Sequence, residues 1–296
     1  MRDNVIYFGY LALRSALNFT PKFIIKASAF CLARAAYYID RKHTAIVHKN
    51  LEFFLGDRYD PFARKKIAKA TYYRFLIYLF DILKTRGRDK SALKTIVSVE
   101  NETILLDAIN DNEKIILLTG HYGYWELIAQ YICATYRPFV TIGEKLRDSP
   151  KLTAELKRYR ERCGLEVIEK KGAMRLIARA LKEGKIAGFL PDQSTQNGVK
   201  TKLFNRDLTW LDSASRLARQ FDAVVIPCFI TTDDFKRYAL FFMEPLRPDH
   251  SADKERDIER MVAGEALSLQ KAIERNPEEY FWFHKRMKRE IKGFYD

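Results

Sequence analysis

The sequence is poor in cysteine for its length. Its 296 residues include only four, at positions 31, 133, 163 and 228, and no two of them form a CxxC pair. Zinc knuckles and thiol–disulfide redox motifs need such pairs, so neither kind of site is indicated. A chain this long and this poor in cysteine is unlike the small disulfide-stapled proteins, and we expect free thiols in a reducing compartment.

A long uncharged hydrophobic run is also absent. The most apolar stretch covers residues 4–39, but Arg14, Lys22, Lys26 and Arg34 interrupt it. No uncharged part reaches the roughly 18 residues that a membrane-spanning helix usually needs. No small-residue cleavage site of the signal-peptide kind is recognisable.

Pro21 divides this apolar stretch into two halves. Both halves are amphipathic and rich in aromatic residues. We therefore predict that residues 1–40 form two helices at a membrane interface, with basic side chains reaching toward lipid headgroups, and that residues 41–296 form one catalytic domain. A single tilted span and a helical hairpin packed on a soluble core are the alternatives.

Several motifs that would indicate other functions are missing. The chain has no internal repeat, low-complexity tract or linker, and no GxSxG nucleophile elbow. It has no recognisable nucleic-acid-binding module, and its aromatic residues lie in apolar runs, not among the basic ones, so nucleic-acid binding is disfavoured. His43 and His48 are five residues apart on a predicted helix and face different sides, which makes them a poor metal pair and places them in solvent or near headgroups.

Positive charge, by contrast, is abundant. The chain has 52 Lys and Arg against 38 Asp and Glu, a formal net charge of +14. This excess indicates an acidic partner. The alternatives are nucleic acid, an anionic membrane surface, and an acidic protein or substrate, and charge alone does not choose among them.

From about residue 96 onward, short apolar runs alternate with helical segments. This alternation predicts an α/β fold with a mainly parallel central sheet flanked by helices, and the last two strands form an antiparallel edge. The predicted strands cover residues 95–100, 114–120, 139–143, 165–169, 186–191, 223–232 and 238–244. The predicted helices cover residues 124–136, 149–164, 173–185, 210–221 and 255–277.

The strand predicted at 114–120 runs into the sequence "HYGYWE", which places His121 and Glu126 five residues apart. Inside one regular helix this step separates two side chains by roughly 140°, so they could not touch. The spacing fits a histidine on the strand-to-helix turn, permitted by Gly120 and Gly123, and a glutamate on the first helical turn. Ligands of open α/β sheets bind at such strand ends.

In that arrangement Glu126 would hold and orient the imidazole of His121 and stabilise its protonated form. No nucleophile stands beside the pair in sequence, so His121 would deprotonate a substrate hydroxyl, which then attacks an acyl carbonyl. The alternative is a structural histidine at a strand end and a helix N-terminal acid favoured by the dipole. Asp192 and Gln193 follow the strand predicted at 186–191 at the same sheet end and would line the site, unless the aspartate only caps a turn.

Five blocks of the sequence together resemble the lipid A biosynthesis (secondary) acyltransferases, a branch of the H-x4-D/E glycerolipid-type acyltransferases. They are "RKHTAIVHKNLEFF", "HYGYWE", "FLPDQSTQNGVKTKLFNRDLTW", "VVIPCFI" and "PEEYFWFHKRMK". The first is similar to the family's basic helix ending in NL, the third to its DQ segment and the last to its WxHRRF-type signature. The blocks occur in the family's order over nearly the whole chain.

The resemblance implies an O-acyltransferase. It would move a fatty acyl chain from acyl carrier protein to a hydroxyl of a 3-hydroxyacyl chain on a Kdo-bearing lipid A precursor. The reaction would take place at the cytoplasmic face of the inner membrane, with His121 as base and Glu126 as its partner. No metal and no bound cofactor are implied. The implied partners are the acyl-acyl carrier protein donor, an anionic glycolipid acceptor and inner-membrane lipids, but no nucleic acid.

Two departures from the family pattern affect the predicted substrate-binding residues, which are Lys145, Asp192, Gln193 and Arg286. Many members carry an arginine in the segment where this chain reads "TIGEKLRDSP". Lys145 is the candidate for the equivalent cation, and the neighbouring Glu144 or Arg147 would move this assignment by one or two positions. At the C-terminal signature Arg286 keeps the cation, but Met287 replaces an aromatic residue. The same chemistry on a mannosylated phosphoinositide, another glycolipid or a lysophospholipid is the alternative function, and a non-catalytic basic membrane-binding protein is a lesser one.

Overall fold

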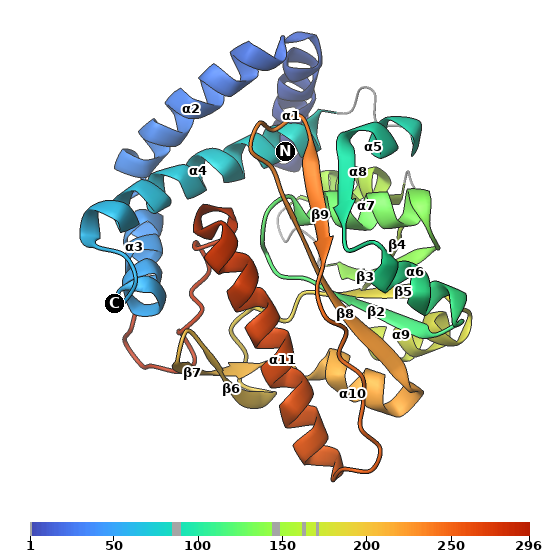
Figure 1. Ribbon diagram of the computed structural model, residues 1–296. Coiled ribbons are helices and arrows are strands. Elements are labelled where there is room, and N and C mark those ends of the chain that lie inside the picture. Colours follow the sequence, from blue (N-terminus) through green and yellow to red (C-terminus); the bar gives the residue numbers. More distant parts are fainter. Residues whose placement is uncertain (1, 85–89, 144–148, 162–163, 170–171) are drawn as a thin grey trace.

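A seven-stranded, mainly parallel sheet lies at the centre of the protein (Figure 1). The structure is a computed structural model that describes residues 2–84, 90–143, 149–161, 164–169 and 172–296. The strand order is β1-β9-β8-β2-β5-β3-β4. The strands are β1 (Val97–Glu100), β2 (Lys114–Leu118), β3 (Phe139–Gly143), β4 (Glu166–Glu169), β5 (Ile186–Phe189), β8 (Ala223–Thr231) and β9 (Tyr238–Phe242). The predicted α/β fold class is confirmed.

The antiparallel pair at the end of the chain lies inside the sheet. β8 and β9 are antiparallel, as predicted, with Thr231 opposite Ala239. However, β1 pairs parallel with β9 on its outer side, with Val97 opposite Tyr238, so β1 forms the edge of the sheet. The prediction that the last two strands form the edge was wrong because the position of β1 depends on a pairing between segments about 140 residues apart.

Helices cover both faces of the sheet. The sides alternate along β2: Ile115 and Leu117 pack in one core with α7, while Ile116 and Leu118 pack in another with α9. The first face carries α5 (Lys90–Ile96), α6 (Thr103–Asn110) and α7 (Trp125–Thr135), and the second carries α9 (Ala173–Lys182), α10 (Ser213–Phe221) and α11 (Lys254–Arg275). α8 (Pro150–Glu161) precedes β4.

Four N-terminal helices lie beside the sheet, at the upper left of Figure 1. They are α1 (Arg2–Phe19), α2 (Lys22–Ile39), α3 (Arg41–Leu55) and α4 (Pro61–Leu83). Pro21 separates α1 from α2, as predicted, and Asp60 caps α4 by accepting a hydrogen bond from Ala63 N. Within the described ranges, no helix has both the length and the apolar content needed to cross a bilayer.

The two N-terminal histidines have side-chain partners, and the cysteines that the structure describes are free thiols. His43 Nδ1 is 2.7 Å from Asp40, and half of the His43 side chain is exposed. His48 differs from the prediction of a solvated residue because its Nε2 atom is 2.8 Å from Tyr37 Oη in a half-buried contact. No group of three or more potential metal ligands occurs among the residues described. The free thiols that the structure describes are Cys31, Cys133 and Cys228, whereas Cys163 lies outside the described residues.

A hairpin that the sequence pattern did not reveal lies against α11. Its strands are β6 (Val199–Leu203) and β7 (Arg206–Trp210), joined in antiparallel register. Its strand propensity is masked by Lys200 and Lys202, which alternate with the inward-facing residues. A 3₁₀ turn η1 (Pro277–Glu279) and the C-terminal segment follow α11 and pass beside this hairpin (Figure 1).

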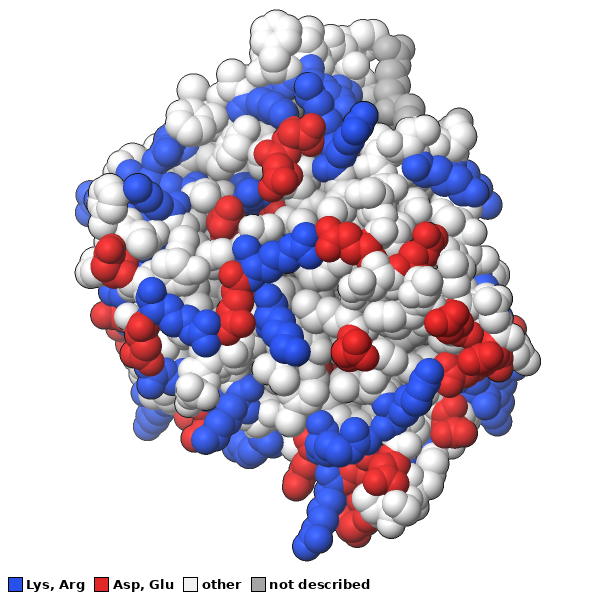
Figure 2. Space-filling model, viewed as in Figure 1, with Lys and Arg blue, Asp and Glu red and all other residues white. Residues whose placement is uncertain are grey.

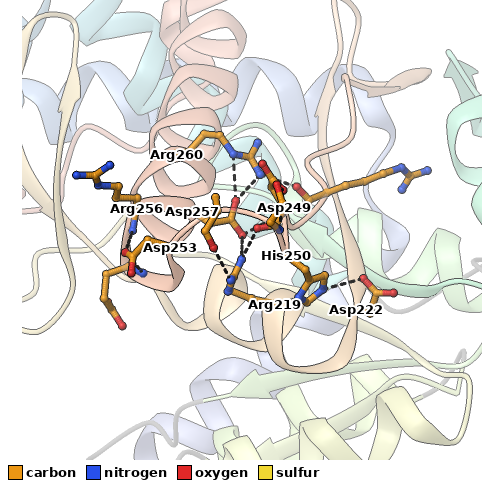
Figure 3. Close-up of polar contacts among 12 residues, drawn as sticks. Arg219, Asp222, Asp249, His250, Asp253, Arg256, Asp257 and Arg260 are labelled. Atoms are coloured by element: carbon orange, nitrogen blue, oxygen red, sulfur yellow. Dashed lines mark hydrogen bonds and ion pairs between the residues drawn. The ribbon is translucent and has the colours of Figure 1, made fainter.

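An ion-pair network fixes the start of α11 to α10 (Figure 3). The fully buried Asp257 carboxylate accepts hydrogen bonds from Arg219 at 2.7 Å and from Arg260 at 2.6 Å. Arg219 also donates to the carbonyl of Asp249. Burial would raise the pKa of Asp257, but the two arginines hold it below its usual value. The buried charge is therefore compensated, and α11 is held in place along the sheet.

Candidate active site

His121 lies on the turn that connects β2 to α7, as its spacing from Glu126 predicted. β2 and β5 are parallel neighbours, and α7 begins at Trp125, so Glu126 is in the first helical turn. Gly123 has a φ of 60°, and a side chain there would place Cβ 1.7 Å from the Ile230 carbonyl oxygen. At Gly120 a Cβ would lie 3.3 Å from the Asp192 carboxylate. The two glycines thus let the turn approach β8 and Asp192 closely.

Asp192 is the carboxylate that holds His121. It follows β5 and is fully buried. Its Oδ2 atom accepts a hydrogen bond from His121 N at 2.9 Å, and its Oδ1 atom accepts one from His121 Nδ1 at 2.8 Å. Because β2 and β5 are parallel neighbours, their carboxyl ends meet at one sheet edge and bring together two residues 71 positions apart.

This contact sets the charge and the tautomer of the imidazole. Burial alone would lower the pKa of His121, but the nearby Asp192 carboxylate raises it above its usual value, and Glu126 adds to the rise. Burial would raise the pKa of Asp192, but its interactions with His121 hold it far below its usual value. Because Nδ1–H donates a hydrogen bond to Asp192, Nε2 carries the lone pair and can accept a proton from a substrate.

Glu126 has a different partner from the one predicted. Its carboxylate accepts two hydrogen bonds from the Arg160 guanidinium of α8, the Nε contact being 2.9 Å long. Glu126 therefore acts on His121 through its charge, while Asp192 makes the orienting hydrogen bond. The prediction that Glu126 itself orients the imidazole is wrong, because the helix start directs this side chain toward α8. Its role in catalysis stays a prediction.

The lone-pair side of His121 faces a mixed polar and aromatic surface. Gln193 Nε2 lies 3.3 Å from His121 Nε2, so this exposed amide and Asp192 both lie at the histidine, as predicted. The rings of Trp125, Phe281 and His284 lie 5.1, 6.2 and 4.9 Å from the imidazole, measured between centroids. The side chain of His121 is 15% exposed, so a substrate can reach a nitrogen that is largely shielded from water.

The C-terminal segment forms one wall of this site. Its backbone pairs with the histidine turn, with Phe281 N donating to His121 O at 2.8 Å and Gly123 N donating to Glu279 O at 3.0 Å. Glu279 is buried and accepts hydrogen bonds from Arg74 and from Tyr78 Oη on α4. The segment is therefore held between the His121 turn and α4.

His284 brings a second imidazole to the site. Burial and the nearby His121 lower the pKa of His284 to about 4, so it stays neutral at physiological pH. Asn50 of α3 donates hydrogen bonds of 2.7 Å to the carbonyl oxygens of Trp282 and His284. The "NL" and "WFHKR" blocks of the sequence thus meet in space, 232 residues apart at Asn50 and Trp282.

Of the two cations predicted to bind substrate, the structure describes Arg286 but not Lys145. Arg286 is buried, donates to the Thr209 carbonyl oxygen at 2.9 Å and lies over the Trp210 ring. The structure thus gives it a packing contact with the β6–β7 hairpin, and its contact with substrate stays a prediction. Lys145 lies outside the described residues, as do Glu144 and Arg147.

Several site residues were not singled out from the sequence. Arg160 occurs in a run of basic helical residues with nothing to distinguish it from its neighbours. Phe281 and His284 lie within the quoted block "PEEYFWFHKRMK", so their signal was present, but the block does not say which of its side chains face the site. Trp125 reads as an ordinary apolar residue at a helix start.

Comparisons with known proteins support the family resemblance found in the sequence. A family model described as "Bacterial lipid A biosynthesis acyltransferase" matches residues 2–289 of the chain. The chain is also similar to a phosphatidylinositol mannoside acyltransferase of Mycolicibacterium smegmatis, with 22% identity over 166 residues. That match spans 54% of this chain and 54% of the relative, about half the length of each protein.

Proposed function

The chain belongs to the bacterial lipid A biosynthesis acyltransferase family, and we propose that it is an acyltransferase that moves a fatty acyl chain from acyl carrier protein to a hydroxyl of a lipid A precursor. One observation carries the chemistry. Asp192 fixes His121 with Nδ1 as donor, so the lone pair is on Nε2, where an alcohol that replaces the Gln193 contact can give up its proton. The acceptor hydroxyl is that of a 3-hydroxyacyl chain on a Kdo-bearing precursor, as the family resemblance implies.

The proposed reaction is a direct transfer. His121 Nε2 takes the proton of the acceptor hydroxyl while its oxygen attacks the thioester carbonyl of the donor. The tetrahedral intermediate collapses, the carbon–sulfur bond breaks, and the departing thiolate takes the proton back from Nε2. The products are an ester and the free thiol of the carrier. Asp192 stabilises the imidazolium that forms in between.

Charge supports an acidic donor and an anionic acceptor. Residues 22–74, which cover α2 to the middle of α4, hold twelve Lys and Arg against four Asp and Glu. Acyl carrier protein is acidic, and a lipid A precursor carries phosphates and acidic sugars, so both would be attracted to such a surface.

The N-terminal helices α1 to α4 support a role at a membrane interface, which in our proposal is the cytoplasmic face of the inner membrane. Of the sixteen large apolar side chains that the described residues leave exposed, twelve lie between positions 5 and 79. The most exposed are Phe19, Phe23 and Ile39, at 71 to 80%. Figure 2 shows that white and blue predominate at the top of the view, over α1 and α2, whereas red and blue are mixed lower down. Apolar and basic side chains on one surface suit an anionic lipid interface.

A mannosylated phosphoinositide is the second candidate acceptor. The mycobacterial relative supports it, since its name states that it acylates such a lipid. Both acceptors are anionic glycolipids with hydroxyl groups, so one His121 base could serve either. The DQ and WFHKR blocks of the sequence favour the lipid A precursor.

An acyl-transfer assay tests the proposal. Wild type and His121→Asn would be given acyl carrier protein loaded with a saturated chain, together with either a lipid A precursor or a phosphatidylinositol mannoside. Asparagine keeps an N–H for Asp192 but has no counterpart of Nε2, so activity should fall at least 10²-fold while the melting temperature stays close to that of wild type.

Each outcome has a distinct meaning. A product heavier by one acyl chain, formed from the lipid A precursor by wild type alone, supports the proposal. A product formed only from the mannosylated lipid moves the acceptor to the second candidate. Full activity of His121→Asn would remove His121 as the base.

A further inference from the structure

The side chain of Gln193 covers the lone pair of the proposed base. Its Nε2 atom lies 3.3 Å from Nε2 of His121. Because Nδ1–H of the same ring donates to Asp192, Nε2 of His121 is the acceptor, and the glutamine contributes an N–H to this contact. A hydrogen-bond donor therefore lies where a reacting oxygen must arrive.

The backbone next to Gln193 is held in place, while its side chain is free to turn. The preceding residue, Asp192, is fully buried and accepts two hydrogen bonds from His121. The side chain of Gln193 itself is exposed. Its amide can therefore move by side-chain rotation without disturbing the contact between Asp192 and His121.

Acyl transfer needs a donor in this position. Attack on the thioester carbonyl makes its oxygen negative, and enzymes stabilise such an oxyanion with hydrogen-bond donors that are in place before the reaction. In many acyltransfer sites these donors are backbone N–H groups. Here the N–H groups of His121, Tyr122 and Gly123 already donate to other acceptors, at 2.7 to 3.0 Å, so these parts of the turn are unavailable.

Three other polar side chains near the base are paired or buried. Arg160 donates two hydrogen bonds to a carboxylate of α7, and Arg286 is only 2% exposed. The Nε2 atom of His284 is buried, so a substrate oxygen cannot reach it. In contrast to these three, Gln193 combines exposure with a polar contact to the base.

We propose that Gln193 is a catalytic residue whose amide N–H stabilises the oxyanion of the tetrahedral intermediate. The proposal rests on the acyl-transfer function proposed above. The acceptor hydroxyl replaces the amide at Nε2 of His121, and the amide turns to the carbonyl oxygen, which is bonded to the same carbon as the attacking oxygen. When the carbon–sulfur bond breaks, the carbonyl forms again and the amide returns to Nε2.

Two substitutions of Gln193 separate this role from packing. Gln193→Met keeps the length of the side chain but has no N–H, so kcat should fall by about 10²–10³-fold, the usual loss for one oxyanion donor. KM for donor and acceptor should change little, because the oxyanion does not exist in the bound substrates. Gln193→Glu has nearly the shape of glutamine but places a negative charge at the oxyanion, so its kcat should be lower still.

The experiment measures kcat and KM of acyl transfer for wild type and both variants, with the melting temperature as the test of folding. Gln196→Met is the matched control because Gln196 is an exposed glutamine on the same loop, and its kinetics should equal those of wild type. Full kcat of Gln193→Met overturns the proposal. A rise in KM at unchanged kcat also overturns it, since this would mean binding of the substrate ground state. A glutamate variant more active than the methionine variant would show that shape matters and not the N–H.

Hydrolysis of the donor separates this proposal from the identity of the acceptor. Water can take the place of the acceptor hydroxyl: its oxygen attacks the thioester carbonyl, its proton passes through His121 to the departing thiolate, and a free fatty acid and the carrier thiol are released. This reaction passes through the same oxyanion, so release of fatty acid from acyl carrier protein without acceptor should decrease from wild type to Gln193→Met to Gln193→Glu.

The two assays together assign any failure. If this order holds although neither lipid is acylated, the proposed acceptor fails and the role of Gln193 stands. If wild type and Gln193→Met release fatty acid equally fast, the role of Gln193 fails alone. If wild type neither transfers nor hydrolyses the acyl chain, both proposals fail.

Discussion

At the residue scale, the proposed base is defined by two residues, His121 and Asp192, that follow the neighbouring strands β2 and β5. Asp192 accepts a hydrogen bond from Nδ1–H of His121, which leaves Nε2 as the proton acceptor. The same carboxylate offsets the effect of burial and raises the pKa of the imidazole. The geometry and the electrostatics of the base therefore depend on one buried side chain.

Replacing this carboxylate should change the pH profile as well as the rate. His121 works as a base only when neutral, so the acid limb of kcat/KM lies at its raised pKa. Asp192→Asn removes the negative charge, so the pKa of His121 should fall and the limb should move to lower pH. The plateau should drop by about 10²–10⁴-fold. Steady-state rates of acyl transfer between pH 5 and 9 measure both effects.

The control for this prediction is Asp207→Asn, which removes an exposed aspartate of the β6–β7 hairpin. It should leave both the limb and the plateau where they are. An acid limb that stays in place in Asp192→Asn would mean that another group titrates there.

The second carboxylate of the site should act together with its arginine. Glu126 and Arg160 form a two-bond ion pair, so removing either partner leaves a largely buried charge uncompensated. We expect Glu126→Gln and Arg160→Gln each to lower kcat/KM by about 10²-fold or more, and the double variant to be no worse than the single ones. A double-mutant cycle in the acyl-transfer assay measures this coupling. If Arg160→Gln kept the full rate while Glu126→Gln lost it, Glu126 would act on His121 or substrate without Arg160.

At the element scale, the C-terminal segment is fixed by contacts to elements far away in sequence. Asn50 holds it to α3, Glu279 holds it to α4, and Arg286 holds it to the β6–β7 hairpin. These contacts place Phe281 and His284 against the turn that carries His121. The two sequence blocks near opposite ends of the chain that resemble the family therefore pack on one another through Asn50.

A buried glutamate on α11 should make stability depend on pH. Glu265 is fully buried and accepts hydrogen bonds from Trp210 Nε1 and Ser215 Oγ. Burial raises its pKa to about 7, from 4.5. The folded state therefore binds more protons than the unfolded state between pH 4.5 and 7, and stability should fall across this window as pH rises, by about 3 kcal/mol from this group.

Urea unfolding at several pH values tests this expectation. Glu265→Gln should be less sensitive to pH between 4.5 and 7 than wild type, since its amide does not titrate. Glu259→Gln, an exposed glutamate on the same helix, should keep the wild-type pH dependence. Equal slopes for Glu265→Gln and wild type would show that another group causes the pH dependence.

At the scale of the whole molecule, the two sides of the protein have different chemistry. His121 follows β2 at the carboxyl end of the sheet. Helices α1 to α4 lie beside the sheet and offer an apolar and basic surface (Figures 1 and 2). An acceptor lipid at an anionic membrane surface and a chain from a soluble donor could therefore approach the same histidine.

Vesicle binding should follow this division of the surface. Replacing Phe19 and Phe23 together by serine removes two of the most exposed aromatic side chains and should weaken binding to anionic vesicles at least tenfold. Binding should also weaken as salt is raised, because lysines and arginines contribute. Co-sedimentation with vesicles measures both effects. Leu267→Ser, which alters an exposed leucine on α11, serves as control, and an equal loss in this variant would place the lipid contact elsewhere.

Local patterns in the sequence were sufficient for the α/β class, for the break at Pro21 and for the position of His121 on a turn with Glu126 at the helix start. Each of these depends on residues close together in the chain, where hydrophobic periodicity, proline and glycine act directly. The family was recognisable for the same reason, since its blocks are short stretches in a fixed order.

The partner of His121, the placement of β1 at the sheet edge and the pairing of Glu126 with Arg160 were decided only by the tertiary structure. Asp192 reaches His121 across 71 residues because two parallel strands end side by side, and Arg160 of α8 reaches Glu126 across 34 residues. Hydrogen-bond partners and strand neighbours depend on which elements are packed together, and the spacing of residues along one chain does not contain that information.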